Sequence, residues 1–258
     1  MERPQVPISR AGKKLLQTAL GQFGYRIVAL RETMPRQEFG LTRLFPMLRD
    51  LGFAPKHVVD VGANRGYWTR SALNYFPDAE YSLIEPQDEL KTYVQDLIDR
   101  GCKIRWINAG ASDQPGLLPF TICKRDDSSN FLMSEEEAQT DGLRRIGVRV
   151  RTIDEIIASE DLPMPEIVKI DAEGFDLKVF AGASTLIGKT EVFFIEVDLR
   201  DGRTNSMLEV VRRMSDSGYE LLDVTDLNRS PKYGVLWLME LVFLRKGSRL
   251  LDAAPTYE

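Results

Sequence analysis

One stretch restricts the fold more than any other, residues 57–71, which read His-Val-Val-Asp-Val-Gly-Ala-Asn-Arg-Gly-Tyr-Trp-Thr-Arg-Ser. The short β-branched run at its start is typical of a strand buried on both faces. Gly62, Asn64 and Gly66 follow at every second position and allow the backbone to turn sharply. A helix over residues 66–76 is expected next. Strand, loop and helix N-terminus together form a cradle for the polar part of a nucleotide-like ligand.

A second strand, expected over residues 80–85, ends in the acid Glu85, 19 residues after Gly66. An acidic side chain at this place can accept hydrogen bonds from both hydroxyls of a ribose. The two features together predict an α/β domain that binds a nucleoside. The alternative is a plain α/β sheet whose loops happen to contain glycine and glutamate, and the motifs that follow make it the weaker interpretation.

The rest of the chain alternates between predicted strands and helices. Helices are expected over 87–100, from Thr152 onward, after residue 174 and over 206–217, and strands over 103–109, 116–122, 148–150, 167–171, 191–197, 219–224 and 235–245. No helix separates the last two strands, so they should pair antiparallel. This order predicts an α/β fold, a doubly wound sheet of seven strands with an antiparallel terminal hairpin.

Two segments differ from this pattern. Residues 1–50 are expected to form a helical cap segment ahead of a main domain over 51–258, with a lid or a homodimer contact through the N-terminal helices as alternatives. Residues 124–145 form a long polar stretch with few apolar anchors. Such loops inside a domain are usually functional or mobile, so this one is interpreted as a substrate-facing lid, with a solvated surface loop as the alternative.

Composition excludes several classes of protein. The net charge of −5 and the isoelectric point near 5.2 argue against a general nucleic-acid binder. No apolar run approaches the length of a transmembrane helix, and the N-terminus lacks the apolar core of a signal peptide. Two cysteines, Cys102 and Cys123, provide neither a disulfide framework nor a metal cluster. We therefore expect a cytoplasmic enzyme.

Acidic side chains gather where the predicted strands end, the edge at which doubly wound sheets bind ligands. These acids are Asp60, Glu85, Asp113, Asp171, Glu173, Glu196 and Asp198. Asp113 is interpreted either as a partner of an adenine amine or as an ordinary turn residue. Lys169 and Asp171 lie two residues apart on one strand, so their side chains point the same way. A lysine in so apolar a strand needs a partner, because a buried unpaired charge is costly.

The motifs in their order resemble those of the FkbM-type methyltransferases over roughly residues 55–245. The matching pieces are residues 60–69, Glu85-Pro86, Ala111-Ser112-Asp113, residues 152–155, the run Ile-Val-Lys-Ile-Asp-Ala-Glu-Gly at 167–174, and Glu196. The resemblance implies a class I, Rossmann-like methyltransferase fold with S-adenosylmethionine as donor. It also implies an oxygen acceptor on a sugar, a glycolipid or another natural product. Phe175-Asp176 departs from the family's usual small residue followed by Glu.

The resemblance also implies roles for single residues. The donor would be bound by the first motif, by Glu85 at its ribose and by the third motif at its adenine: Asp60, Gly62, Asn64, Gly66, Thr69, Glu85, Ser112, Asp113 and Asp171. Asp171 and Glu173 would face the sulfonium and the acceptor, with Lys169 as an electrostatic partner.

Methyl transfer to a hydroxyl requires alignment of the two reactants and removal of a proton. The only histidine, His57, begins the first strand and so lies at the wrong end of the sheet for a base. Two schemes remain open. Either Asp171 or Glu173 acts directly as the base, or Asp171, Glu196 and Asp198 bind a divalent cation such as Mg²⁺ that acidifies the hydroxyl.

Two other function classes share part of the pattern. A nicotinamide-dependent oxidoreductase has the same first loop and ribose acid, but the terminal hairpin and residues 169–174 argue against it. A non-catalytic Rossmann-like binding module would keep the fold alone. Acids at every donor-facing position argue against that loss of function.

Overall fold

The computed structural model describes residues 40–250 except 201 and 203. The helices and the dimer contact predicted within residues 1–39 therefore lie outside the described residues, and the domain boundary at residue 50 stays a prediction. The described part opens with helix α2 (Leu41–Asp50), which contains Pro46. Its side chains Leu44, Phe45 and Leu48 are buried.

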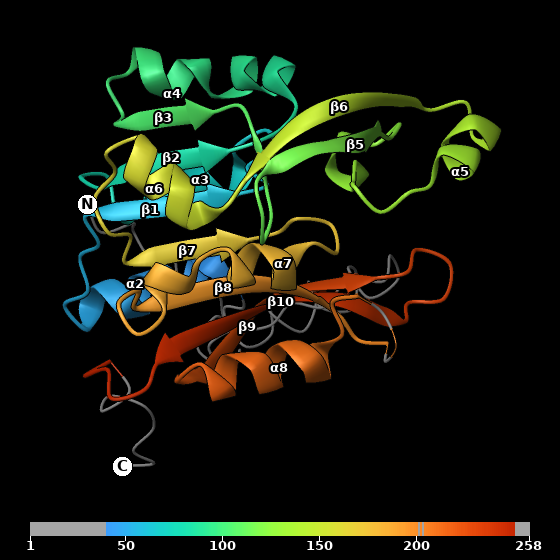
Figure 1. The fold of residues 1–258 in the computed structure, drawn as a ribbon. Helices are drawn as coiled ribbons and strands as arrows, with labels where there is room; N and C mark the ends of the chain where they lie inside the picture. Colours follow the sequence, from blue (N-terminus) through green and yellow to red (C-terminus); the bar gives the residue numbers. More distant parts are fainter. Residues whose placement is uncertain (1–39, 201, 203, 251–258) are drawn as a thin grey trace, which may run out of the picture. The chain divides into compact units, whose positions relative to one another are not determined.

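A seven-stranded sheet in the order β3-β2-β1-β7-β8-β10-β9 forms the centre of the fold (Figure 1). The strands are β1 (His57–Val61), β2 (Glu80–Ile84), β3 (Ile104–Ile107), β7 (Ile167–Ile170), β8 (Val192–Asp198), β9 (Tyr219–Arg229) and β10 (Leu236–Arg245). The first five of these run parallel, and β10 pairs antiparallel with both β8 and β9. The doubly wound, seven-stranded prediction with its terminal hairpin is confirmed.

The strand order also fixes where a ligand can bind. Strands β2 and β3 are added in turn on one side of β1. Strands β8, β10 and β9 lie on the opposite side, beyond β7. The neighbouring strands β1 and β7 therefore flank the point where the winding reverses. In open α/β sheets the crevice at this point, outside the carboxyl ends of the strands, binds the ligand.

Helices cover both faces of the sheet. One face packs against α6 (Ile153–Ser159), α7 (Asp176–Ala181) and α8 (Met207–Asp216); in Figure 1, α6 and α7 lie in front of the strands, and α8 lies below β9 and β10. The other face packs against α2, α3 (Tyr67–Leu73) and α4 (Gln95–Asp99). On that second face the Phe45 ring lies within 6 Å of the rings of Trp68, Phe76 and Phe194. This aromatic cluster fixes α2 and α3 on the sheet.

Local structure differs from the prediction at several elements. The helix expected over 66–76 ends at Leu73, and the helix expected over 87–100 consists of the 3₁₀ segment η1 (Asp88–Val94) followed by α4. The strands expected at 116–122 and 148–150 leave the main sheet. They form a separate three-stranded sheet from β4 (Gly110–Ala111), β5 (Gly116–Ile122) and β6 (Arg144–Arg151).

The polar stretch 124–145 is more ordered than the interpretation as a plain loop implies. It contains the 3₁₀ turn η2 (Asp126–Ser128) and helix α5 (Glu135–Thr140), whose N-terminus is closed by a capping box between Ser134 and Glu137. Phe131 anchors the stretch, because its ring lies 4.7 Å from that of Phe120 and 5.1 Å from that of Phe175. One aromatic side chain thus holds a segment that hydropathy alone marks as unanchored.

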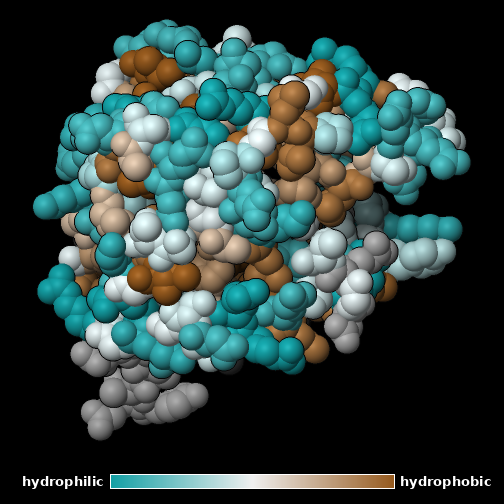
Figure 2. All heavy atoms as spheres, viewed as in Figure 1, coloured by the Kyte–Doolittle hydropathy of each residue, from teal (hydrophilic) through white to brown (hydrophobic). Residues whose placement is uncertain are grey.

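The surface is mixed in character. Hydrophilic residues cover much of the face shown in Figure 2, with hydrophobic groups visible between them. Leu117 on β5 is 73% exposed, the same fraction as Tyr233 beside the hairpin of β9 and β10. In the part of the chain that the structure describes, no helix combines the length and apolar character needed to cross a membrane.

Candidate functional site

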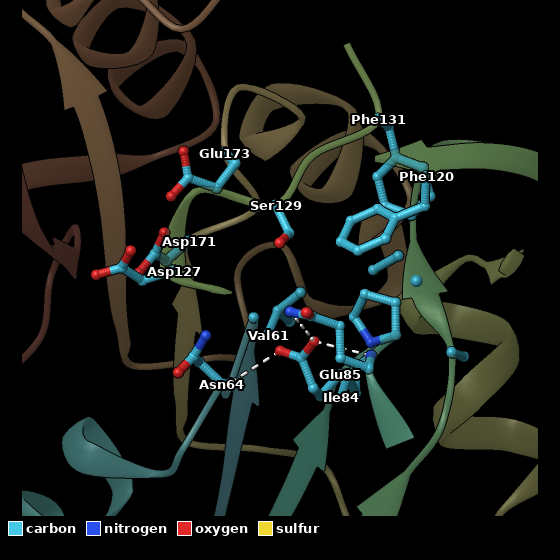
Figure 3. Close-up of a pocket in the computed structure, with 17 residues that line it drawn as sticks. Val61, Asn64, Ile84, Glu85, Phe120, Asp127, Ser129, Phe131, Asp171 and Glu173 are labelled. Atoms are coloured by element: carbon cyan, nitrogen blue, oxygen red, sulfur yellow. Dashed lines mark hydrogen bonds between the residues drawn. The ribbon is translucent and has the colours of Figure 1, made fainter. Parts of the chain in front are cut away.

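A pocket lies at the carboxyl end of the sheet where the winding reverses (Figure 3). It encloses about 560 Å³, including its open mouth. Its walls come from the loops after β1, β2, β3 and β7 and from the small sheet with the segment that follows it. The lining residues are Val61, Gly62, Asn64, Ile84, Glu85, Pro86, Gln87, Ala109, Gly110, Ala111, Phe120, Asp127, Ser129, Phe131, Asp171, Ala172 and Glu173.

The first loop has the backbone that its sequence predicts. Gly62 and Gly66 take φ values of 70° and 71°, and Asn64 takes 47°. At Gly62 a side chain is excluded, because a Cβ there would lie 1.8 Å from the backbone oxygen of Asp171. The glycine therefore lets the loops after β1 and β7 touch. Gly66 is not part of the pocket wall; a Cβ on it would meet Val94 at 2.5 Å.

Glu85 forms the floor of the pocket. Its two carboxylate oxygens accept hydrogen bonds of 2.9 Å from the backbone N–H groups of Asn64 and Gln87. These bonds fix the position of the carboxylate, and a carboxylate has lone pairs for further hydrogen bonds. Burial raises the pKa of Glu85 to about 7, although the two N–H groups act in the opposite direction. A ligand that donates hydrogen bonds to the charged carboxylate would offset this cost of burial.

Two acids, Asp171 and Glu173, line the other side of the pocket, and Glu196 lies close to them. Asp171, Glu173 and Glu196 each place a carboxylate oxygen within 4.8 Å of the others. Figure 3 shows Asp171 and Glu173 on the side of the pocket opposite Phe120 and Phe131. The predicted metal-binding trio contains Asp198 beside Asp171 and Glu196, and it stays a prediction, because in the described part of the chain Asp198 is not among the acids whose oxygens converge. Asp198 forms an ion pair with Arg200, and Glu173 takes its place in the cluster.

Lys169 links this cluster to the interior. As its alternation with Asp171 predicts, the two side chains point the same way, with Lys169 Nζ 3.1 Å from Asp171 Oδ2. The ammonium also lies 3.4 Å from Asp60 Oδ1 and donates a 3.1 Å hydrogen bond to the carbonyl of Gly62. Burial lowers the pKa of Lys169, but Asp171, Asp60 and Glu240 together raise that pKa above its ordinary value, which favours the charged ammonium.

Glu173 is held in an unusual conformation. Its φ of 51° lies in the left-handed region, and the following Gly174 has φ 91°. The buried Asp176 stabilises this turn by accepting 3.0 Å hydrogen bonds from the N–H groups of Ala172 and Gly174. The acid that departs from the family's usual sequence thus has a structural role.

The charges around Glu173 disfavour its ionised form. Burial, then Asp171, Asp176 and Asp127, raise the pKa of Glu173 to about 8. Burial also raises the pKa of Glu196 well above its ordinary value, and Asp171 adds to the effect. No described residue donates a hydrogen bond to the Glu173 carboxylate. The site therefore holds an acid whose proton is exchanged near neutral pH.

Other predicted residues do not line the pocket. Asp60 and Thr69 are fully buried and bond to each other at 2.5 Å. Ser112 donates to the side chain of Asp113, and neither residue is part of the pocket wall, whereas the preceding Gly110 and Ala111 are. His57 lies at the amino end of β1, as predicted, with its ring bonded to the Pro163 carbonyl and the Ser82 hydroxyl.

Sequence reasoning gave no site role to several lining residues, among them a group from outside the main sheet, Phe120, Asp127, Ser129 and Phe131. They come from the small sheet and from the polar stretch after it, which was expected to face substrate only in general terms. The isolated Phe131 within a polar stretch was the one available signal, because a lone aromatic residue in such a segment usually packs against something.

Several solved structures of methyltransferases are similar to this chain. An FkbM methyltransferase from Methylobacillus flagellatus has a TM-score of 0.47 and 19% identity, covering 72% of this chain and 43% of its own. This chain thus spans less than half of that protein. A putative O-methyltransferase from Klebsiella pneumoniae has a TM-score of 0.47 and 11% identity, with 93% and 92% covered.

A third similar structure is 1,6-didemethyltoxoflavin-N1-methyltransferase from Burkholderia thailandensis with bound S-adenosylhomocysteine, at a TM-score of 0.42, 14% identity and 95% and 93% covered. No curated protein matches the sequence. The family model for the methyltransferase FkbM domain matches residues 60–221, which is more than half of the chain and contains the whole lining of the pocket. The chain belongs to the FkbM methyltransferase family.

Proposed function

We propose that this methyltransferase transfers the methyl group of S-adenosylmethionine to a hydroxyl oxygen. The observation that carries the proposal is one pocket with two unlike acidic ends. Glu85, fixed by two backbone N–H groups, lies at one end, and the cluster around Asp171 lies at the other. Ribose hydroxyls fit the first end, and the positive charge of a sulfonium fits the second.

The wall between the two ends suits the remaining parts of the donor. Ile84, Ala109, Phe120 and Phe131 offer an apolar surface for a flat adenine ring. The loop from Gly62 to Asn64 would receive the amino-acid part. In this arrangement Gly110 and Ala111, rather than the side chains of Ser112 and Asp113, line the adenine end.

We assign the catalytic base to Glu173. Asp171 is engaged by the Lys169 ammonium at 3.1 Å, which makes its carboxylate a fixed negative charge beside the sulfonium. Glu173 has no such partner among the described residues, lines the pocket and has a pKa near 8. In the reaction the acceptor oxygen bonds to the methyl carbon, the carbon–sulfur bond breaks, and the hydroxyl proton goes to Glu173.

A divalent cation is the competing scheme. The oxygen donors of Asp171, Glu173 and Glu196 suit Mg²⁺, which would acidify a bound hydroxyl. Against it, one oxygen of Asp171 already bonds to the Lys169 ammonium. We therefore propose direct carboxylate chemistry. EDTA should leave the rate unchanged, whereas a loss of activity that Mg²⁺ restores would favour the cation.

The acceptor we propose is a hydroxyl of a sugar, a glycolipid or another natural product, methylated in the cytoplasm. Family membership supports a methyl transfer, and the acids around Glu173 support a hydroxyl-bearing, uncharged group at the reaction centre, since a phosphate or carboxylate there would be repelled.

Calorimetry with S-adenosylhomocysteine and with NAD tests the donor. Binding of the first and not of the second is expected, and the reverse would indicate an oxidoreductase. A screen of purified glycosides and glycolipids with a radiolabelled methyl donor then tests the acceptor class. Label recovered only on nitrogen or carbon would overturn O-methylation.

A further inference from the structure

A buried network connects two parts of the pocket. One is the loop of residues 62–66, here called the donor loop, and the other is the acid cluster of Asp171, Glu173 and Glu196. Asp60 on β1 and Lys169 on β7 lie on paired positions of neighbouring strands, and their side chains meet in the interior. Asp60 has no exposed surface, and Lys169 is only 4% exposed. Two opposite charges at this depth are retained at a substantial cost of desolvation.

Each member of the network holds the next one. The Thr69 hydroxyl, on α3, donates to Asp60 Oδ2 at 2.5 Å. The other oxygen, Asp60 Oδ1, forms an ion pair with Lys169 Nζ at 3.4 Å and accepts no hydrogen bond from a described residue. Lys169 then reaches both the Gly62 carbonyl and Asp171 at 3.1 Å. Gly62 opens the donor loop, and Asp171 belongs to the acid cluster.

We infer that Asp60 is a positioning residue that acts through Lys169, and that it sets the donor loop and Asp171 in register with each other. This inference rests on the proposed function, and it replaces the contact with the donor that the first motif implied for Asp60. Asp60 cannot touch a ligand in the pocket, because it is fully buried and is absent from the pocket wall.

The close approach of the two loops explains why such a device is needed. The Gly62 backbone and the Asp171 carbonyl are so near that no Cβ fits between them. A small displacement of either loop therefore changes the distance from donor to acid. The Lys169 ammonium bonds to both loops and is itself paired with Asp60. These contacts fix the distance between the donor loop and Asp171.

The test uses Asp60→Asn, which keeps the size of the side chain and an oxygen for Thr69 but removes the charge that holds Lys169. S-adenosylhomocysteine is the probe, because it lacks the sulfonium charge and so reports loop position rather than electrostatic attraction. Calorimetry should show an affinity at least about threefold weaker, the lower range of coupling within one network. Amide exchange of residues 62–66 in the free protein should also accelerate.

A double-variant cycle separates positioning from general stability. If Asp60 acts through Lys169, the effects of Asp60→Asn and Asp171→Asn on affinity will not add, since both remove a partner of the same ammonium. Ser82→Ala is the matched control, because it removes a buried hydrogen bond to His57 away from the pocket. It should lower the melting temperature without changing affinity or loop exchange.

Each outcome decides the matter. Unchanged affinity and unchanged exchange of residues 62–66 in a folded Asp60→Asn protein would overturn the inference, as would strict additivity in the cycle. Should Asp60→Asn fail to fold, Thr69→Val removes the hydroxyl behind Asp60 at constant volume and is expected to show a smaller change in the same direction. If the wild type itself does not bind S-adenosylhomocysteine, the proposed function fails, and the exchange measurement alone then decides the role of Asp60.

Discussion

Lys169 Nζ lies 3.1 Å from Asp171 Oδ2, whereas Glu173, two residues further along, forms no ion pair with any residue in the described part of the chain. The run that carries these three residues thus places a fixed charge and an exchangeable proton side by side. The ion pair with Lys169 therefore distinguishes Asp171 from Glu173, two carboxylates that the sequence alone left as equal candidates for the catalytic base.

Glu85→Ala should weaken binding of S-adenosylhomocysteine by more than tenfold. The substitution removes hydrogen bonds to a charged group, each worth roughly 1.5–3 kcal/mol. Calorimetry measures the affinity, and a melting curve checks the fold, because the N–H groups of Asn64 and Gln87 also lose their acceptor. The Glu80→Ala variant, at an exposed position on the strand β2 that precedes Glu85, is the control. An unchanged affinity in folded Glu85→Ala would contradict the assignment of the ribose site.

Glu173→Gln should lower kcat by about a hundredfold or more, the usual scale for a positioned acid–base group. Affinity for S-adenosylhomocysteine should change little, because Glu85 and the first loop remain. In the wild type the rate should rise with pH through about 8, since burial and the nearby acids raise the pKa of Glu173 to that value and only its ionised form accepts a proton.

Asp171→Asn tests the same assignment through the pH dependence of the rate. Its loss should also reduce kcat by about a hundredfold, because a charge beside the sulfonium is removed. The remaining activity should rise at a lower pH than in the wild type, since Asp171 contributes to the raised pKa of Glu173. A pH profile identical to that of the wild type, measured on an identified acceptor, would show that Glu173 is not the base.

Stability should fall as the pH rises toward neutrality. Burial raises the pKa of Asp176 from 3.8 to about 7 in the folded protein. The folded state therefore holds a proton that the unfolded state has lost, and this contribution to stability is present below pH 3.8 and is lost as the pH passes 7. Within that window one such group changes the free energy of unfolding by about 1.4 kcal/mol per pH unit.

Denaturant unfolding at several pH values measures this slope. Asp176→Asn should make it less steep, and Asp99→Asn on the exposed surface serves as the control. The same slope in the wild type and in Asp176→Asn would show that the carboxyl group of Asp176 is ionised across the whole range.

The segment from η2 to Phe131 should become protected when donor binds. Asp127, Ser129 and Phe131 line the pocket, and the Thr121–Asn130 bridge connects the segment to β5. Hydrogen exchange of residues 126–131 should slow with S-adenosylhomocysteine and slow further with acceptor, while exchange in α8 should not change. Equal exchange in all states would mean that this segment is a fixed wall and not a lid.

His57→Ala should leave kcat unchanged. The imidazole lies at the amino end of the sheet and is fully buried, and burial lowers its pKa. Loss of its bonds to Pro163 and Ser82 should reduce the free energy of unfolding by about 1–3 kcal/mol, measured by denaturant titration. A drop in kcat without a loss of stability would contradict this structural role.

The sequence by itself determined the main sheet, its terminal hairpin and the first loop. Alternation along strands is a local property, so the shared direction of Lys169 and Asp171 was also readable without a structure. The conformation of Gly62 and Gly66 was readable for the same reason, because glycine is the residue that such backbone angles favour.

Only the tertiary structure decided which acids converge. Glu173 and Asp198 each follow a predicted strand and look alike in the sequence, yet among the described residues the carboxylate of Glu173 converges with those of Asp171 and Glu196, whereas that of Asp198 pairs with Arg200. Likewise, the burial of Asp60 follows from the pairing of β1 with β7, 109 residues apart by position. Contacts between distant segments depend on strand order and on loop paths, which local patterns do not encode.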